Sequence, residues 1–509
     1  MSDLKPRVRF APSPTGPLHM GGVRTALYNY LFAKKHGGTF ILRIEDTDQT
    51  RYVEGAEDYI MSALNWCNLL PQEGPGLGGQ HGPYRQSERK EMYAKYADQL
   101  IDSGNAYYAF DTAEELDTKR KSAEKGDWRY GIGTREGMNN SLGMNEEELT
   151  KRFATDAPYV IRFKTPENET ITFTDEIRDE VSFDSKVLDD KVIFKSDGMP
   201  TYHLANIVDD HLMEITHVIR GEEWLPSAPL HVLLYRAFGW EAPKFAHLPL
   251  ILKPTGNGKL SKRDGAKFGF PVFPLEWFDH KENETYSGYK EEGYLPEAFT
   301  NMLLMLGWNP GTEQELFTHD EMVKAFSLDR VVKSGARFDP DKAKWFNENW
   351  LRNLSNQDIL VLLQPLAAEK EIGMSEYKLS ELIGLLKERV SFIHEFLEAG
   401  YLFGAPQSYD EKTVKKKWKD QSAELMKELA SKFATLKDFN AVTAKETFSA
   451  FMAEKEVGFG QLGPALRLLL TGLGGGPDLF EIMNFLGKEE SLSRMEAGSP
   501  AIVTMKSQM

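Results

Sequence analysis

The sequence predicts an α/β protein in which a nucleotide-binding sheet is split by an inserted α+β region and followed by an all-α carboxy-terminal part. Three observations favour this fold class. Residues 7–46 follow a strand, loop, helix, strand order, apolar strand segments return after residue 200, and helical periods dominate after about residue 330. A chain of 509 residues is also far longer than a single core usually grows, so several domains are expected.

The first unit combines strand segments at 8–10 and 39–44 with a helix between them. In the helix, Val23, Leu27 and Leu31 recur at four-residue intervals, which is the spacing of one buried helix face. The glycine pair at 37–38 ends the helix. This order is typical of a βαβ unit, and the amino end of its helix meets a glycine-rich loop.

The middle of the chain has a different texture. A helix is expected over 88–103, a polar stretch rich in Lys, Gly and Asn covers 119–143, and residues 170–173 alternate as a strand does. We interpret this part as an inserted α+β domain.

Strand segments typical of a parallel sheet return at 192–194, 217–220 and 248–252, and a helix is expected around 227–238. Because such segments occur on both sides of the insertion, the sequence predicts a split Rossmann-type nucleotide-binding domain.

After about residue 330 the helical periods include 379–397, 425–436 and 466–473. The tail from Glu489 onward is polar, and we expect it to fray. We divide the chain into five segments: 1–90, 91–195, 196–255, 256–335 and 336–509.

Composition excludes some classes of protein. The hydrophobic fraction of 41% and the charged fraction of 27% are ordinary for globular proteins. The net charge of −16 argues against a protein that coats nucleic acid non-specifically. Five lysines around Trp418, at 412, 415–417 and 419, are a local exception, and they fit either an RNA-tracking surface or a solvated helix face.

Residues 1–6 contain no apolar signal-peptide core, and the chain has no run of about 18 apolar residues, so we expect a cytoplasmic protein without a membrane span. Cys67 is the only cysteine, which excludes an internal disulfide and any zinc site with two or more thiolates. The adjacent Asp209, Asp210 and His211 are a weak metal signal, because neighbouring residues rarely converge on one ion.

Residues 12–22, with the sequence PSPTGPLHMGG, lie between the first strand and its helix. Gly21 and Gly22 at the helix entrance let a ligand approach backbone N–H groups, and the helix dipole favours a phosphate there.

Residues 258–263, with the sequence GKLSKR, form a second candidate loop with three cations and a hydroxyl. Such a loop can close over a triphosphate and offset charge as pyrophosphate leaves. It is not a Walker A loop, because the position of the first glycine is occupied by Lys253.

The two loops together resemble the HIGH-type and KMSKS-type motifs of class I aminoacyl-tRNA synthetases, about 240 residues apart. Gly22 replaces the last histidine of the first motif, so one imidazole contact to ATP is not carried over. Four further segments resemble bacterial-type glutamyl-tRNA synthetases: 42–48 (LRIEDTD), 200–211 (PTYHLANIVDDH), 218–225 (VIRGEEWL) and 461–472 (QLGPALRLLLTG).

The resemblance implies an enzyme that activates L-glutamate with ATP and Mg²⁺, forms glutamyl-adenylate, and transfers the glutamyl group to tRNA(Glu). It implies an acceptor-stem-binding domain at 91–195, a stem-contact region with the second motif at 256–335, and an anticodon-binding domain at 336–509. It further implies a monomer without zinc.

The resemblance also implies roles for particular residues. The catalytic residues are His19, Lys259 and Lys262. The ATP-binding residues are Thr15, Gly16, His19, Gly21, Gly22, Ser261, Lys262 and Arg263. The glutamate-binding residues are Arg9, Ala11, Ser13, Glu45, Tyr202, Asn206 and Arg220. The tRNA-binding residues are Asp48, Trp224 and Arg389.

Three alternatives make different predictions. A glutamyl-queuosine tRNA-modifying enzyme shares the catalytic half but typically ends near residue 300. A glutaminyl enzyme carries β-barrel domains after that half, whereas this sequence is helical there. A non-catalytic RNA-binding paralogue would have lost His19, Lys259 or Lys262, and all three are present.

Overall fold

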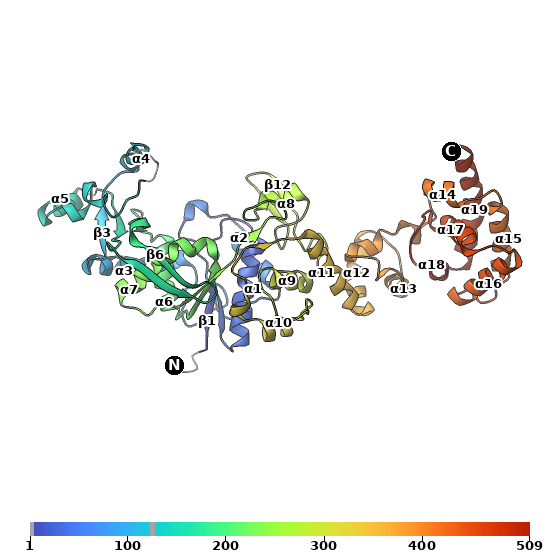
Figure 1. Ribbon diagram of the computed structural model, residues 1–509, viewed down its shortest axis with the longest axis horizontal. Helices are drawn as coiled ribbons and strands as arrows, with labels where there is room; N and C mark the ends of the chain where they lie inside the picture. Colours follow the sequence, from blue (N-terminus) through green and yellow to red (C-terminus); the bar gives the residue numbers. More distant parts are fainter. Residues whose placement is uncertain (1–4, 123–127, 156) are drawn as a thin grey trace. The chain divides into compact units, whose positions relative to one another are not determined.

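The computed structural model describes residues 5–122, 128–155 and 157–509 (Figure 1). Residues 1–4, which belong to the segment examined for a signal peptide, and 123–127, inside the predicted polar stretch, lie outside the described residues. The chain forms two compact units, Met1–Ala343 and Lys344–Met509. None of the described helices is both long and apolar enough to cross a membrane.

Four parallel strands form the centre of the amino-terminal unit. They are β1 (Arg7–Phe10), β2 (Thr39–Leu42), β8 (His217–Gly221) and β9 (Lys244–Leu248). β1 pairs with β2, and β8 pairs with β9. Just before β8, the backbone N–H of Thr216 donates to the carbonyl of Arg7 at 2.9 Å, which places β1 beside β8. Strands from the two sides of the insertion therefore lie side by side, although their ladders β1-β2 and β6-β5-β9-β8 remain separate. The predicted split nucleotide-binding fold is confirmed.

Helices cover this sheet and fix the loop after β1. They are α1 (Met20–Lys35), α2 (Ala56–Trp66), α6 (Tyr202–Leu212) and α7 (Ala228–Phe238). In α1, Val23, Leu27 and Leu31 are fully buried, as their spacing predicts. Arg24 of the same helix donates from Nη1 to the carbonyl of Leu306 at 2.8 Å, which ties α1 to the chain that follows the second loop.

The insertion contains its own antiparallel sheet, in the order β3 (Ala106–Ala109), β4 (Val160–Phe163), β7 (Val192–Phe194). Its helices are α3 (Lys90–Asp102), α4 (Ala113–Ser122) and α5 (Glu146–Ala154). The prediction that residues 192–194 return to the parallel sheet is wrong, because β7 pairs antiparallel with β4. A three-residue apolar run fits either sheet, so its sequence does not specify the partner strand.

The hairpin of β5 (Thr170–Asp175) and β6 (Asp179–Asp184) also differs from expectation. Its sequence was assigned to the insertion, but β5 pairs parallel with β9, so the hairpin extends the central sheet in the order β6-β5-β9-β8. This connection brings Asp175 next to β9.

The amino-terminal unit continues with short strands and helices. They are β10 (Ile251–Leu252), α8 (Lys262–Phe268), β11 (Trp277–Asp279), β12 (Glu284–Tyr286), α9 (Pro296–Met305), α10 (His319–Ala325) and β13 (Ala336–Arg337). α9 and α10 lie against α1 (Figure 1). The boundaries at 90, 195, 255 and 335 remain predictions.

The predicted helical segment 336–509 begins with the two residues of β13, and from Pro340 onward the described residues form helices and no strand. Its helices are α11 (Pro340–Asn353), α12 (Asn356–Glu369), α13 (Glu376–Leu386), α14 (Glu411–Lys417), α15 (Ser422–Ala434), α16 (Ala441–Glu454), α17 (Phe459–Thr471), α18 (Leu479–Leu486) and α19 (Lys488–Ser507).

One expectation for this part is wrong, and one of two open alternatives loses support. The tail does not fray, because α19 packs Met495 and Ile502, seven positions apart, into the core of the unit. Two apolar residues separated by two turns lie on one helix face, a signal that overall polarity hides. Trp418 is only 2% exposed and belongs to the same core, so it is not free to stack on a base.

Candidate active site

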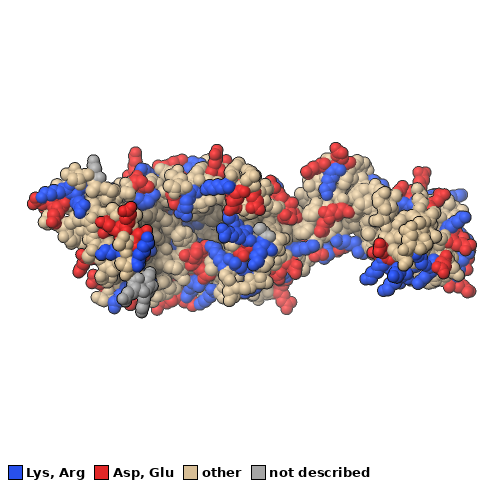
Figure 2. Space-filling model, turned by 90° about the horizontal axis from the view of Figure 1, so that it is seen from above, with Lys and Arg blue, Asp and Glu red and all other residues tan. Residues whose placement is uncertain are grey.

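A cavity of about 650 Å³ opens at the carboxyl ends of β1 and β8 in the amino-terminal unit. Figure 2 shows lysine and arginine side chains gathered beside a hollow in this unit. Ligands of open parallel sheets bind at this edge, because loops diverge there and helix amino ends point toward it.

Most of the predicted site residues line this cavity. The predicted glutamate-binding residues that line it are Arg9, Ala11, Ser13, Glu45, Tyr202, Asn206 and Arg220. The predicted ATP-binding and catalytic residues that line it are Thr15, Gly16, His19, Gly21, Gly22, Lys259, Ser261 and Lys262. Trp224 lines it too, whereas Arg263, Asp48 and Arg389 do not.

His19 stands at the amino end of α1 with one ring nitrogen unpaired. Its Nδ1 accepts a hydrogen bond from the backbone N–H of Gly21 at 3.1 Å, which caps the helix. Burial, and then the nearby Lys259 charge, lower the pKa of His19 to about 4, so the ring is neutral near pH 7. Because Nδ1 accepts, the proton is on Nε2, and this buried atom has no partner among the described residues. The ring can therefore donate to an anionic oxygen in the cavity.

Little space is left for a side chain at Gly22. A Cβ added there would lie 2.5 Å from Cδ1 of Leu18, closer than carbon atoms approach. A side chain at this position would therefore displace Leu18. The expectation that the backbone N–H groups here are free for a ligand is wrong, because Gly21 donates to Nδ1 of His19 at 3.1 Å and Gly22 donates to the carbonyl of His19 at 2.8 Å.

The second loop presents two lysines to the same end of the cavity. Lys259 pairs with Glu223 at 2.8 Å. Nζ of Lys262 lies 3.8 Å from both Asp279 and Glu282, and its side chain is 44% exposed. The Lys262 contacts are long, and both lysine side chains are about half exposed, so these ion pairs cost little to exchange for contacts to a phosphate.

Ser261 and Arg263 have different surroundings from those two lysines. The Ser261 hydroxyl donates to Asp264 at 2.6 Å and caps α8, so it is already engaged. Arg263 is exposed and outside the cavity lining.

Arg220 marks the opposite end of the cavity. It is 5% exposed, its Nε donates to Nε2 of His247 at 3.1 Å, and its Nη1 donates to the hydroxyl of Tyr202 and to Nδ1 of His231, both at 3.2 Å. Its Nη2 has no partner within the described part of the chain, and no carboxylate there pairs with it. A buried guanidinium without an anion is costly, which favours an anionic ligand.

Arg9, by contrast, already has an anion. Its Nε and Nη2 donate to the two oxygens of Asp210 at 2.9 and 3.1 Å. Burial alone would raise the pKa of Asp210, but Arg9 and Arg43 hold this pKa below its usual value. The predicted pairing of Arg9 with a substrate carboxylate would therefore share this guanidinium with Asp210.

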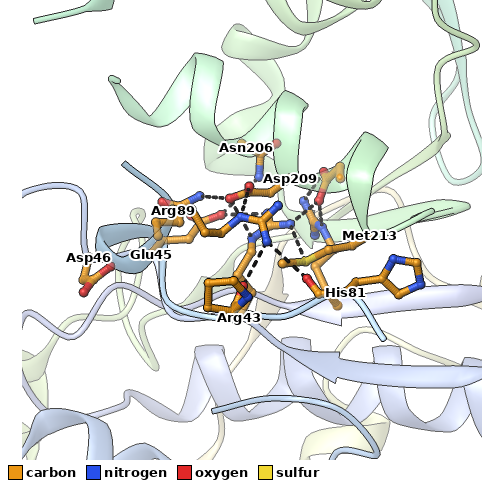
Figure 3. A network of polar contacts seen from close by, with 12 residues as sticks. Arg43, Glu45, Asp46, His81, Arg89, Asn206, Asp209 and Met213 are labelled. Carbon is orange, nitrogen blue, oxygen red and sulfur yellow. Dashed lines mark hydrogen bonds and ion pairs between the residues drawn. The ribbon is translucent and has the colours of Figure 1, made fainter. Parts of the chain in front are cut away.

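Arg9 belongs to a buried network of three guanidinium groups and three carboxylates (Figure 3). Arg43 bonds Asp210 at 2.7 Å and Glu45 at 2.9 Å, and Arg89 bonds Asp209 at 2.7 Å. This network was not predicted from the sequence. The Asp209-Asp210 pair was its signal, and the charges are explained by arginines rather than by a metal. His211 stacks on Trp240 with ring centroids 3.7 Å apart.

Glu45 lies where this network reaches the cavity. Its Oε1 accepts from Arg43 at 2.9 Å and from Asn206 at 3.2 Å, while Oε2 accepts no hydrogen bond from the residues that the structure describes. Burial raises the pKa of Glu45, and Arg43 counteracts this rise. One oxygen is thus held and the other is available to a cationic donor.

The predicted tRNA contacts lie in three different places. Trp224 packs on Tyr202, with centroids 4.2 Å apart, and is 37% exposed. Asp48 is exposed and bonds Thr50 and Arg51, each at 2.6 Å. Arg389 belongs to the carboxy-terminal unit, where it is exposed and lines a cavity of about 420 Å³.

Fold and cavity together define a class I tRNA synthetase. Residues 5–345 match the family model described as tRNA synthetases class I (E and Q), catalytic domain, and residues 349–499 match an anticodon binding domain. The chain belongs to the glutamate–tRNA ligase family within this class.

Relatives resemble the chain over its whole length. The glutamate–tRNA ligase of Christiangramia forsetii is 57% identical and that of Bacteroides fragilis 55%, with 99% and 97% of this chain covered and 99% of each relative. The crystal structure of a glutamate tRNA ligase from Elizabethkingia meningosepticum in complex with its amino acid has a TM-score of 0.95 at 52% identity, covering 98% of this chain and 100% of that one.

Proposed function

We propose that this chain joins L-glutamate to tRNA(Glu) in two steps. ATP and glutamate give glutamyl-adenylate and diphosphate, and the terminal ribose of the tRNA then takes the glutamyl group and releases AMP. The observation that carries the choice of amino acid is Arg220, which lines the cavity and whose buried Nη2 has no partner among the described residues. Full-length likeness to glutamate–tRNA ligases supports the same reaction.

In this proposal the amino-acid end of the cavity holds glutamate. Arg220 binds a substrate carboxylate, and Tyr202, whose hydroxyl already lies 3.2 Å from Nη1 of Arg220, hydrogen-bonds the same group. Oε2 of Glu45 accepts from the substrate ammonium. Arg9, Asn206, Ala11 and Ser13 complete the wall. A neutral or cationic side chain would leave Arg220 unpaired, which disfavours glutamine and lysine.

The phosphate end holds ATP. Nε2–H of His19 faces the polyphosphate, Gly21 and Gly22 let it approach the start of α1 closely, and Lys259 and Lys262 offset its charge. Thr15, Gly16, Ser261 and Arg263 complete the proposed ATP contacts. The α-carboxylate of glutamate attacks the α-phosphorus in line, so the rate comes from positioning and electrostatics and needs no protein nucleophile.

Mg²⁺ fits this site only through ATP. The cavity is lined by two carboxylates, Glu45 and Glu223, and these are engaged with Arg43 and Lys259. Within the described ranges, no three His, Cys, Asp or Glu side chains gather as a metal site. We therefore assign Mg²⁺ to the phosphates and derive no step from a protein-held ion.

The remaining assignments belong to the proposal as well. Asp48, Trp224 and Arg389 contact tRNA, residues 91–195 and 256–335 bind its acceptor stem, and residues 336–509 bind its anticodon. A single chain suffices because all proposed glutamate ligands, and all proposed ATP ligands except Arg263, line one cavity. We propose the cytoplasm as its location, since tRNA charging takes place there, and no requirement for zinc.

The test is incorporation of radiolabelled glutamate, with glutamine in parallel, into acid-precipitable tRNA with ATP and Mg²⁺. We expect glutamate-only, ATP-dependent labelling. For Arg220→Ala we expect kcat/KM for glutamate to fall by roughly 10² to 10³, because a buried charge pair with the substrate is lost. Labelling with glutamine would overturn the pocket assignment, and no labelling with either amino acid would favour a non-catalytic RNA-binding role.

A further inference from the structure

Two histidines that lie outside the cavity lining make hydrogen bonds with Arg220. His247, from β9, accepts from Nε of Arg220 at 3.1 Å, and His231, from α7, stands 3.2 Å from its Nη1. Both imidazoles are fully buried, and neither belongs to the cavity lining. Their contacts therefore act on the guanidinium and not directly on a ligand.

The hydrogen bonds of His247 determine its tautomer. Because Nε of arginine can only donate, Nε2 of His247 is the acceptor and its proton is on Nδ1. Nδ1 lies 2.6 Å from Oδ2 of Asp175, to which it donates. Oδ1 of Asp175 accepts from the backbone N–H groups of Ile177 and Arg178, each at 3.0 Å. The carboxylate is thus fixed at the end of β5 and orients the ring.

His231 repeats this arrangement without a carboxylate. Its Nδ1 accepts from Nη1 of Arg220, so its proton is on Nε2, which lies 3.1 Å from Nδ1 of His203. Burial lowers the pKa of His231 and of His247, so both rings are neutral acceptors. Arg220 is therefore held by three neutral groups: two imidazoles and the Tyr202 hydroxyl.

The difference from Arg9 shows what this arrangement achieves. Asp210 binds Arg9 directly through two hydrogen bonds. Asp175 reaches Arg220 only through the neutral imidazole of His247, which lies between them. A neutral acceptor fixes the direction of a guanidinium without cancelling its charge, so the full charge of Arg220 is left for a ligand.

We propose that His231 and His247 are specificity-determining positioning residues. By holding Arg220 with neutral acceptors they preserve an uncompensated positive charge, and this charge selects the glutamate anion against uncharged glutamine. Asp175 and His203 act one step further back by fixing the two rings. The inference rests on the proposed function, because it concerns the choice of amino acid in that reaction.

An isosteric pair of variants separates charge from shape. In both His231→Asn and His231→Asp, a side-chain oxygen replaces Nδ1 as acceptor, and both lose the bond to His203. They have nearly the same shape and differ in charge and in one atom, which is a donating nitrogen in asparagine and an accepting oxygen in aspartate. We expect His231→Asn to raise the KM for glutamate less than about 10-fold and His231→Asp to raise it about 100-fold or more, because the new carboxylate pairs with Arg220. The KM for ATP should stay the same in both.

The measurement is tRNA charging with glutamate and with glutamine, together with circular dichroism of each variant. The ratio of the kcat/KM values for glutamate and glutamine should fall much further in His231→Asp than in His231→Asn. Equal KM values for glutamate in the two variants, or equal rises in the KM for glutamate and ATP, would show that His231 only fills space and would overturn the inference.

A second pair keeps the test decisive if the aspartate variant does not fold. His247→Gln retains a neutral acceptor near the position of Nε2, and His247→Leu removes it. We expect the KM for glutamate to be at least about 10-fold lower in His247→Gln than in His247→Leu. Equal KM values in the two variants would contradict the inference. Failure of the proposed function looks different, because the unaltered protein would then not charge tRNA with glutamate at all.

Discussion

The two ends of the cavity are built in opposite ways. At the amino-acid end, Arg9, Arg43 and Asp210 are 3%, 0% and 1% exposed and are joined by hydrogen bonds of 2.7–3.1 Å. At the phosphate end, Lys259 and Lys262 are 55% and 44% exposed, and among the described residues the acidic oxygens nearest to Lys262 lie 3.8 Å away. One end is fixed before a ligand arrives, and the other presents loosely held charge.

The difference follows from what each end must do. Discrimination between glutamate and glutamine depends on one charge at a defined position, and a buried network supplies it because neighbouring pairs lock each side chain. Offsetting charge on a polyphosphate needs cations that exchange partners as diphosphate leaves, and solvated lysines do this at small cost. Substitutions at the two ends should therefore affect different quantities.

The largest expected effect is on stability at the buried end. Asp210→Ala leaves Arg9 and Arg43 without their shared anion, so we expect the free energy of unfolding of the amino-terminal unit to fall by about 3–5 kcal/mol. Urea unfolding followed by tryptophan fluorescence measures it. Asp48→Ala is the control, because Asp48 pairs with Arg51 at the exposed surface and its loss should leave the transition midpoint unchanged. Similar midpoint shifts in both variants would show that the buried ion pairs stabilise the fold no more than an exposed pair does.

At the exposed end the expected effect is on rate. Lys262→Ala should lower kcat by roughly 10² to 10³, the usual loss when one group that stabilises charge in a transition state is removed, and should leave the unfolding midpoint unchanged. Initial rates of tRNA charging at saturating glutamate and ATP measure it. Lys267→Ala, also on α8 but outside the cavity lining, is the matched control and should keep its activity. An unaltered kcat for Lys262→Ala would refute the assigned role.

His19, at the phosphate end, makes the stability of the protein depend on pH. Its folded pKa of about 4 lies below the ordinary value of 6.5, so between these values the unfolded chain binds the proton and the folded chain does not. Stability then rises with pH across this window and is lost as pH falls from 6.5 toward 4, by about 2 kcal/mol between pH 7 and pH 5. His19→Gln should lose less stability than the unaltered protein over that interval. An equal loss would contradict a neutral His19.

Local sequence was enough to predict the elements that form the phosphate end. The order of strand, PSPTGPLHMGG loop and helix is contiguous, so its geometry is set within residues 7–35, and the amphipathic period of α1 located the helix correctly. The helical carboxy-terminal part was predictable for the same reason, since its signals repeat within each helix.

The amino-acid end was predictable only through resemblance. Arg9, Glu45, Asn206 and Arg220 come from four separate elements, and nothing within any one of them shows that they meet. His231 and His247 were missed entirely, because a buried histidine has no periodicity of its own. Long-range pairing also explains the wrong placement of residues 192–194, which could have joined either of two sheets.

The smallest expected effect concerns metal, and it applies to both ends. Cys67 is the only cysteine, it is buried at the end of α2, and burial raises the pKa of its thiol, so no thiolate cluster can form there. Treatment with a zinc-selective chelator in excess Mg²⁺ should therefore leave the charging rate unchanged. EDTA without added Mg²⁺ is the positive control and should stop the reaction, since ATP loses its cation. Inactivation by the zinc chelator and rescue by zinc would mean that histidines and carboxylates alone bind a catalytic or structural ion. The proposal that the protein itself holds no metal ion would then be wrong.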